Sequence, residues 1–521
     1  MRVALAQVES RVGDFARNLD RLAAAQAEGG ERGADIVVFP EMSLVGYPPR
    51  DLLLDPGFVA EAFEAGREAA RRTATGPPCL VGGLARSPGR LPQHPSLANA
   101  ALLLSGGAVA HVQPKRLLPS YEVFLETRWF LPGSASEPFV VAGRRCGALV
   151  CEDLWDEGYP AHPAASLAAK GAEVLLALVA SPWRAGIPAE RLRAARRHRK
   201  PTAFVNAVGV RDELIFDGGS FALSADGDEI ARLPRFAEGL EVVGLDAVEP
   251  LPAATETEPG AELFAALAFG VRGFVEGNGL PSAVLGLSGG VDSALVAAIA
   301  VEALGPERVA AVHVPSRFTD PRSTEAAREV SASLGIRLEE RPLEPLLAPL
   351  EAGLADLLDG SAAGRRAHEN LQARLRMSVL AAHVNRHGGL LLNASNKTEL
   401  ALGYGTLWGD LAGLLSPIGD LPKTEVVRLA RWVARTRGTI PPFVLERAPT
   451  AELAQGQADP FDYDVVSPRV EALVSYAGVG DEALRAAVRR AEGKRFVHGI
   501  VLKVSRVSFG SGRMVPVTRA W

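Results

Sequence analysis

Short apolar runs alternate with longer amphipathic stretches throughout the first half of the chain. The short runs have the length and composition of buried strands, and the longer stretches repeat apolar residues at helical spacing. We expect strands over Val3–Gln7, Ile36–Phe39, Cys79–Gly82, Ala100–Leu104, Ala148–Cys151, Val174–Val179 and Ala203–Asn206. We expect helices over Ala16–Glu28, Ala60–Thr73 and Pro188–Lys200. The alternation predicts an α/β fold for this half.

The second half opens with a different order of the same elements. A helix is expected over Leu263–Glu276, followed by a buried strand, Ala283–Leu287, and a Gly-rich turn. An apolar helix, Ser293–Leu304, and another strand, Val309–Val314, complete a βαβ unit. Such a unit implies a parallel sheet, with a ligand at the carboxyl ends of its strands.

A polar segment separates the two halves. Glu249–Gly260 is poor in apolar residues and rich in Pro, Thr and Glu, which is typical of an exposed linker. A chain of 521 residues also exceeds one ordinary hydrophobic core. We therefore predict a domain over 1–248, a linker over 249–261 and a second domain over 262–521.

Composition and charge exclude several classes of protein. The apolar fraction of 47% is that of a globular protein, and 56 basic against 61 acidic residues leave a net charge of only −5. This balance offers no electrostatic basis for a nucleic-acid or membrane surface. The sequence contains neither a bilayer-length apolar run nor a signal-peptide layout, and its three cysteines are too few for a disulfide framework. We expect a cytoplasmic protein with small-molecule partners.

A Gly-rich loop between the strand and the apolar helix carries the sharpest local signal. It comprises Gly286, Leu287, Ser288, Gly289, Gly290, Val291, Asp292 and Ser293. Adjacent glycines and a helix N-terminus direct N–H groups at an anion, and the serine hydroxyls add donors. Asp292 would repel phosphate unless it holds Mg²⁺. The loop is neither a Walker A motif nor a dinucleotide GxGxxG.

A carboxylate, a cation and a thiol form the candidate chemistry of the first half. Glu41 and Cys151 each follow a predicted strand, and Lys115 lies in a segment that ends in Pro119 and Tyr121. A carboxylate can take the thiol proton, the thiolate can attack an amide carbon, and an ammonium can hold the oxyanion. The set therefore suits acyl transfer from an amide.

The Gly-rich loop resembles the PP-loop of ATP pyrophosphatases, which include NAD, GMP, asparagine and argininosuccinate synthetases. Three further stretches, Glu369–Met377, Asn396–Asp410 and Ser416–Val426, are similar to NAD synthetases in order and gaps. The resemblance implies Mg²⁺ at Asp292 and Glu399. It implies ATP contacts from the loop and from Lys423, Thr450 and Ser395, the last in place of a threonine that the family has at Ala394. It implies deamido-NAD contacts from Asn370, Arg376, Glu399, Trp408, Asp410 and Lys494.

The first half resembles the nitrilase superfamily. The resemblance places its catalytic residues on Glu41, Lys115, Cys151 and Glu126, and leaves Cys79 and Cys146 as core residues. The glutamine-specific branch adds Tyr121 and Ser181 as substrate contacts. Where that branch has a basic residue, this chain has Ile187. We therefore expect Arg184 or Arg191 to hold the glutamine carboxylate.

Both halves together resemble glutamine-dependent NAD synthetases over nearly the whole chain. This implies a nitrilase-like α-β-β-α sandwich joined to a PP-loop parallel-sheet domain of the adenine nucleotide alpha hydrolase type. It also implies glutamine, ATP, Mg²⁺ and deamido-NAD as reactants and cofactor, a protected passage for ammonia, and a homo-oligomer formed through the second domain. Three alternatives stay open: a ligase that uses only ammonia, a nucleotide-binding regulator, and an amidotransferase for another substrate.

Overall fold

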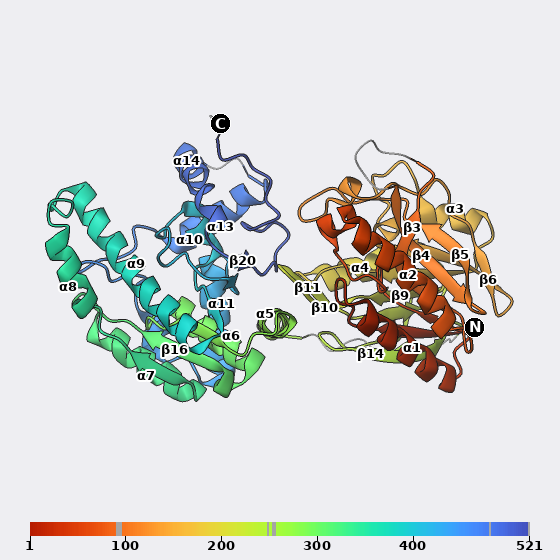
Figure 1. The fold of residues 1–521 in the computed structure, drawn as a ribbon, viewed down its shortest axis with the longest axis horizontal. Helices are drawn as coiled ribbons and strands as arrows, with labels where there is room; N and C mark the ends of the chain where they lie inside the picture. Colours follow the sequence, from red (N-terminus) through yellow and green to blue (C-terminus); the bar gives the residue numbers. More distant parts are fainter. Residues whose placement is uncertain (90–95, 247–248, 253–256, 479–480, 519–521) are drawn as a thin grey trace. The chain divides into compact units, whose positions relative to one another are not determined.

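The structure, a computed structural model, describes residues 1–89, 96–246, 249–252, 257–478 and 481–518 (Figure 1). It divides into two compact units. The N-terminal unit comprises Met1–Arg211 and Ile215–Glu256, and the C-terminal unit comprises Asp212–Leu214 and Thr257–Trp521. Each unit has its own sheets and its own core, so each is described by itself.

Two six-stranded sheets form the N-terminal unit, in the orders β14-β1-β2-β3-β4-β5 and β13-β12-β9-β8-β7-β6. The strands of the first sheet are β1 (Arg2–Gln7), β2 (Ile36–Val38), β3 (Cys79–Arg86), β4 (Leu97–Ser105), β5 (Ala108–Pro114) and β14 (Gly239–Gly244). Those of the second are β6 (Phe139–Val141), β7 (Arg144–Val150), β8 (Val174–Val179), β9 (Thr202–Asn206), β12 (Phe221–Leu223) and β13 (Glu229–Arg232). A separate hairpin pairs β10 (Val208–Arg211) with β11 (Leu214–Asp217).

The two sheets face each other across one apolar core. Alternate residues of both sheets, such as Val3, Leu5, Val150 and Leu176, are fully or almost fully buried in it. Helices cover the outer faces: α1 (Phe15–Glu31) and α2 (Pro56–Arg72) pack on the first sheet, and α3 (Pro163–Ala169) and α4 (Ile187–Arg196) flank the second. This is the expected α-β-β-α sandwich.

Every strand expected in the first half is present. The sequence pattern missed β5 because it is an edge strand with four of its seven residues exposed, so its apolar alternation is weak. Helix α2 begins at Pro56, four residues before the expected start, because Asp55 caps it by accepting hydrogen bonds from the N–H groups of Gly57 and Phe58.

A single six-stranded sheet, in the order β17-β16-β15-β18-β19-β20, organises the C-terminal unit, and all of its neighbouring strands are parallel. Its strands are β15 (Ala283–Gly286), β16 (Val309–His313), β17 (Arg337–Glu340), β18 (Leu390–Leu392), β19 (Leu415–Ser416) and β20 (Ile500–Val501). Parallel strands place their carboxyl ends at one edge, where a ligand is expected. The predicted βαβ unit is therefore confirmed.

Helices surround this sheet (Figure 1). They are α5 (Pro259–Gly277), α6 (Val291–Leu304), α7 (Pro321–Leu334), α8 (Glu344–Gly353), α9 (Ala362–His387), α10 (Lys397–Leu402), α11 (Lys423–Arg437), α12 (Pro442–Glu446), α13 (Tyr463–Val474) and α14 (Glu482–Ala491). Helix α6 packs against α5, α7 and α11, while α9 lies on β15 and β18 and contacts α8. Among the described residues, no helix combines the length and apolar character needed to cross a membrane.

Candidate active sites

Turns at the ends of two strands position the first candidate site. Glu41 follows β2, and Gly82 of β3 lies so close that a Cβ there would be 2.0 Å from the backbone nitrogen of Met42. Cys151 follows β7 directly. Its backbone φ is +46°, a value that residues other than glycine rarely adopt. Strained backbone of this kind gathers at functional sites. The fold thus presents the thiol at a fixed strand end.

A buried ammonium joins two carboxylates beside Cys151. Lys115 Nζ lies 2.7 Å from Glu41 Oε1 and 2.8 Å from Glu126 Oε1, and all three side chains are at most 2% exposed. Glu126 is on the 3₁₀ turn Glu126–Arg128. One buried lysine cannot neutralise two buried carboxylates, so this cluster is energetically costly unless further hydrogen bonds support it. The sequence had placed these four residues in one site, and the structure brings three of them into direct contact.

Two residues that the sequence did not single out complete this arrangement. Asn99 Nδ2 donates to Glu41 Oε1 at 2.6 Å, and Tyr47 Oη donates to Glu126 Oε1 at 2.8 Å. In both carboxylates the second oxygen, Oε2, is buried without a hydrogen-bond partner. Neither residue lay in a motif, since each reads as an ordinary core position of a strand or turn. The two bare oxygens are the ones free to act on a substrate.

Burial controls the protonation of this site. Burial and the neighbouring Glu41 raise the pKa of the Cys151 thiol well above its ordinary value, against the opposing charge of Lys115. Burial also raises the pKa of Glu126 to about 7, although Lys115 opposes it. Burial alone would lower the pKa of Lys115, but the charges of Glu126 and Glu41 outweigh it and raise that pKa. The resting thiol is therefore protonated and needs a base to become a nucleophile.

Polar groups next to Cys151 line the approach to the thiol. Tyr121 Oη and Tyr159 Oη donate to the two oxygens of Glu152, at 3.0 and 2.9 Å. Ser181, which follows β8, accepts through Oγ from Arg191 Nε at 3.1 Å. The structure therefore ties Tyr121 to the carboxylate that follows the nucleophile, which the sequence did not indicate.

The two arginines considered for a glutamine carboxylate differ sharply. Arg191 is 2% exposed, pairs with the buried Asp217 at 2.8 Å and donates to the Ser181 carbonyl. Its charge is already matched inside the fold, so the expectation that it serves a substrate is not supported. Arg184 is partly exposed and, among the residues that the structure describes, forms its ion pair with Glu190, at 2.6 Å. Arg184 can exchange that surface partner for another carboxylate.

The Gly-rich loop joins β15 to α6 and forms the second candidate site. Gly289 has a φ of +83°, and a Cβ there would lie 2.1 Å from the Ser323 carbonyl oxygen, so only glycine fits. Ser288 Oγ accepts from the Gly290 N–H and lies 3.0 Å from Ser293 Oγ. The loop and the N-terminus of α6 form an anion-binding turn.

The two expected metal ligands lie together at the end of this loop. Lys423 Nζ pairs with Asp292 Oδ2 and lies 3.4 Å from Glu399 Oε1, and Asn396 Nδ2 donates to Asp292 Oδ1 at 2.9 Å. Burial and the charge of Asp292 raise the pKa of Glu399 to about 7, against the opposing charge of Lys423. A lysine ammonium thus neutralises two carboxylates where a cation is expected.

The donor set fits Mg²⁺ only together with further oxygens. Within the described ranges, no group of three or more His, Cys, Asp or Glu side chains is arranged to hold a metal ion. Two carboxylates are the usual protein share of a Mg²⁺ site that is completed by water and substrate phosphates. Asp292 and Glu399, beside a phosphate-binding loop, meet that requirement.

The remaining residues implied for nucleotide binding are held by neighbouring groups. Arg376 donates to the Val314 carbonyl and to Ser316, Lys494 donates to the carbonyls of Gly403 and Gly405, and Thr450 donates to the Gln457 carbonyl. Asn370 accepts from Thr406 Oγ1, Asp410 accepts from the Thr406 N–H, and Ser395 Oγ lies 3.5 Å from the Asp410 carbonyl. Trp408 is 65% exposed, with a φ of +59°.

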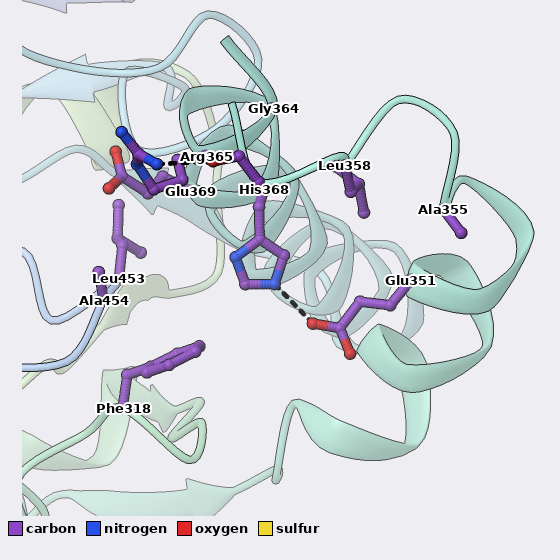
Figure 2. A pocket seen from close by; sticks show the side chains of 11 residues that line it. Phe318, Glu351, Ala355, Leu358, Gly364, Arg365, His368, Glu369, Leu453 and Ala454 are labelled. Carbon is purple, nitrogen blue, oxygen red and sulfur yellow. Dashed lines mark hydrogen bonds and ion pairs between the residues drawn. The ribbon is translucent and has the colours of Figure 1, made fainter. Parts of the chain in front are cut away.

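A cavity of about 440 Å³ opens next to helix α9. Figure 2 shows His368 projecting from α9 between Glu351 and Phe318, with Leu453 and Ala454 on the facing segment. His368 Nε2 lies 2.5 Å from Glu351 Oε1, and its ring is perpendicular to that of Phe318. Glu369, adjacent to Asn370, also lines the cavity. An aromatic and apolar wall with a few charges is typical of a small-molecule pocket.

Both halves of the chain match known protein families. Residues 2–250 match the carbon-nitrogen hydrolase family, and residues 263–495 match the NAD synthase family. The chain is 37% identical to a glutamine-dependent NAD(+) synthetase from Synechocystis, over 100% of this chain and 99% of that protein. It is 38% identical to one from Xylella fastidiosa, again over 100% and 99%. A solved structure of glutamine-dependent NAD+ synthetase from Acinetobacter baumannii, in complex with ADP, has a TM-score of 0.79 at 30% identity and covers 100% of this chain and 99% of its own. The chain therefore belongs to the family of glutamine-dependent NAD(+) synthetases.

Proposed function

We propose that this protein hydrolyses glutamine in its N-terminal unit and uses the ammonia to amidate deamido-NAD in its C-terminal unit, with ATP as the energy source. The observation that carries the proposal is the buried Lys115 that bridges Glu41 and Glu126 beside Cys151. Its support from similarity is the full-length match to glutamine-dependent NAD(+) synthetases.

In the amidase reaction Glu41 takes the proton of the Cys151 thiol through its bare Oε2, and the sulfur attacks the amide carbon of glutamine. The ammonium of Lys115 stabilises the oxyanion that forms. The C–N bond then breaks, the proton passes to the leaving nitrogen, and ammonia departs from a glutamyl thioester. Water attacks the thioester, again with a carboxylate as base, and glutamate and the thiol are regenerated.

Glutamine recognition needs a cation and an anion near the thiol. Arg184 holds the α-carboxylate after exchanging its partner Glu190, and Ser181 adds a backbone or hydroxyl contact. Tyr121 closes the opposite side together with Glu152. The loss of a basic residue at Ile187 makes Arg184, three positions earlier, the available cation.

In the ligase reaction the carboxylate of deamido-NAD attacks the α-phosphorus of ATP, pyrophosphate leaves, and an acyl-adenylate forms. Ammonia then displaces AMP and gives the carboxamide. Asp292 and Glu399 would hold Mg²⁺, which would supply charge neutralisation between the reacting anions. The loop 286–293 and Lys423 direct donors at the phosphates, with Thr450 and Ser395 beside them.

The deamido-NAD contacts are assigned to residues of α9, of α10 and the turn that follows it, and of the 3₁₀ turn Lys494–Phe496: Asn370, Arg376, Glu399, Trp408, Asp410 and Lys494. The cavity beside Phe318 and His368 holds a ring of one of the nucleotides. We also assign the protein to the cytoplasm, which suits three free cysteines, and to a homo-oligomer formed through the C-terminal unit.

The test is NAD formation from deamido-NAD, ATP and Mg²⁺, with either glutamine or ammonium, in the parent and in Cys151→Ala. The variant should lose the glutamine-driven reaction and keep the ammonium-driven one. A parent that forms NAD only from ammonium would make the chain an ammonia-only ligase.

A further inference from the structure

Asn99 of β4 contacts two members of the amidase site at once. Its side-chain Nδ2 donates to Glu41 Oε1 at 2.6 Å, and its backbone carbonyl accepts from the N–H of Lys115 at 2.8 Å. The residue is fully buried. One strand position therefore fixes both the carboxylate and the segment that carries the ammonium.

The other half of the Asn99 amide is unused. Its Oδ1 is buried and has no hydrogen-bond partner. A buried acceptor without a donor costs stability relative to an apolar side chain of similar shape. The fold therefore gives no stabilising reason for an amide here, whereas the donor to Glu41 gives a chemical one.

Glu41 meets several charges from neighbouring elements. Lys115 and Asn99 both occupy its Oε1. The charges of Glu126 and Glu152, the Cys151 thiol and the Tyr47 hydroxyl are also close enough to act on Glu41 electrostatically. Of these groups, Asn99 is a neutral donor that cannot change its charge with pH.

We propose that Asn99 is a positioning residue for the amidase reaction: it holds Glu41 by one oxygen, so that the other oxygen stays bare for the Cys151 proton. This inference rests on the amidase activity proposed above. It does not concern the ligase reaction, since every contact named lies in the N-terminal unit.

The substitution Asn99→Leu removes the donor and also the orphaned acceptor, and it keeps the branching and the number of side-chain heavy atoms. Glutamate release is measured in the full chain with ATP, Mg²⁺ and deamido-NAD present. We expect kcat/KM to fall by about 10- to 100-fold, the effect of one hydrogen bond to a charged group. The acid limb of the pH profile should move up by about one unit, because the carboxylate has lost a donor to its charged form.

Asn18 provides a matched control, because it is a buried asparagine of the same unit whose amide is fully used. It donates to the carbonyls of Arg11 and Leu44 and accepts from the Arg11 N–H. Asn18→Leu should lower the melting temperature and leave the acid limb in place. Asn99→Leu should lower the melting temperature less than Asn18→Leu does, and still move the limb.

Asn99→Ala is measured in parallel, so that the profile can be obtained from a second variant if the leucine is not accommodated. An unmoved acid limb in both Asn99 variants, with the parent active, overturns the inference and leaves the proposed function standing. A parent that releases no glutamate from glutamine overturns the proposed function and the inference with it.

Discussion

In the N-terminal unit, the charged groups of the amidase site meet around one buried ammonium, and each carboxylate keeps one free oxygen. In the described part of the C-terminal unit, Asp292, Glu399 and Lys423 lie together. The other residues proposed to bind nucleotides are engaged with backbone carbonyls and with one another, as Lys494 is with Gly403 and Gly405. The two sites therefore differ in how far they are assembled before substrate arrives.

The reactions explain this difference. Amide cleavage by a thiol needs a base and an oxyanion donor at fixed distances from a small substrate, and a dry preformed site provides them. Ligation brings two large polyanions together, so its donors must stay accessible and be neutralised until the phosphates arrive. Lys423 between two carboxylates illustrates such a holding position, because the ammonium stands where positive charge is needed later.

The largest effect should come from breaking the centre of the preassembled site. Lys115→Met leaves two buried carboxylates without their cation, and glutamine hydrolysis should fall by about 10³-fold, as for an oxyanion donor. Unfolding of the N-terminal unit should become easier by about 3 kcal/mol or more. Ammonium-driven NAD formation checks the other unit and should remain. Retained glutamine hydrolysis in this variant would contradict the role of Lys115.

The corresponding break in the C-terminal unit is Asp292→Asn. It removes one of two charges for Mg²⁺, so NAD formation should fall by about 10²-fold with either nitrogen donor. Glutamate release, measured separately, should persist in this variant. If NAD formation from ammonium survives while the glutamine-driven reaction is lost, Asp292 belongs to a different step.

The pH dependence of stability tests the comparison of the two units through one buried glutamate in each, Glu126 and Glu399. The pKa of Glu126 and that of Glu399 are both raised to about 7, so each contributes stability below pH 4.5 that is lost as the pH rises through 7. We expect a loss of up to about 3 kcal/mol between pH 5 and 8 for each. Calorimetry should show that Glu126→Gln and Glu399→Gln each remove part of this slope.

Mg–ATP should separate these two contributions, because a bound cation lowers the pKa of its ligand. Added Mg–ATP should therefore remove the Glu399 part of the slope and leave the Glu126 part. If Mg–ATP instead removed the Glu126 part of the pH dependence of stability and left the Glu399 part, the assignment of the two sites would be reversed.

The smallest effect concerns glutamine recognition. Arg184→Ala should raise the KM for glutamine by about two- to fivefold, the contribution of one partly exposed ion pair, with kcat little changed. Arg193→Ala, which changes an exposed arginine of the following helix α4, is the control and should leave KM unchanged. Equal effects from both variants would show a general charge effect rather than a contact.

The sequence predicted the α/β elements well, and it predicted that Glu41, Lys115 and Glu126 lie together, for a physical reason. Buried strands and helix α6 have strong periodic patterns, and Glu41, Lys115, Cys151 and the 286–293 loop stand in recognisable local contexts. Edge strand β5 escaped prediction because half-exposed strands have a weak pattern.

Other features could not be predicted because they depend on contacts between distant positions. Asn99 is 58 residues from Glu41, and its neighbours in sequence are alanines and leucines of an ordinary strand. The pairing of Arg191 with Asp217 likewise appears only once β11 and α4 are folded together. Without that contact, Arg184 and Arg191 were equivalent candidates.

The central claim is that nitrogen passes from the first site to the second, and amide-labelled [¹⁵N]glutamine tests it most directly. The parent enzyme is supplied with labelled glutamine, deamido-NAD, Mg–ATP and a trace of unlabelled ammonium, and the carboxamide nitrogen of the product is analysed by mass spectrometry. The account predicts ¹⁵N in nearly all of the NAD formed, and none in the NAD made by Cys151→Ala. Unlabelled NAD from the parent, formed while glutamate accumulates, would contradict it.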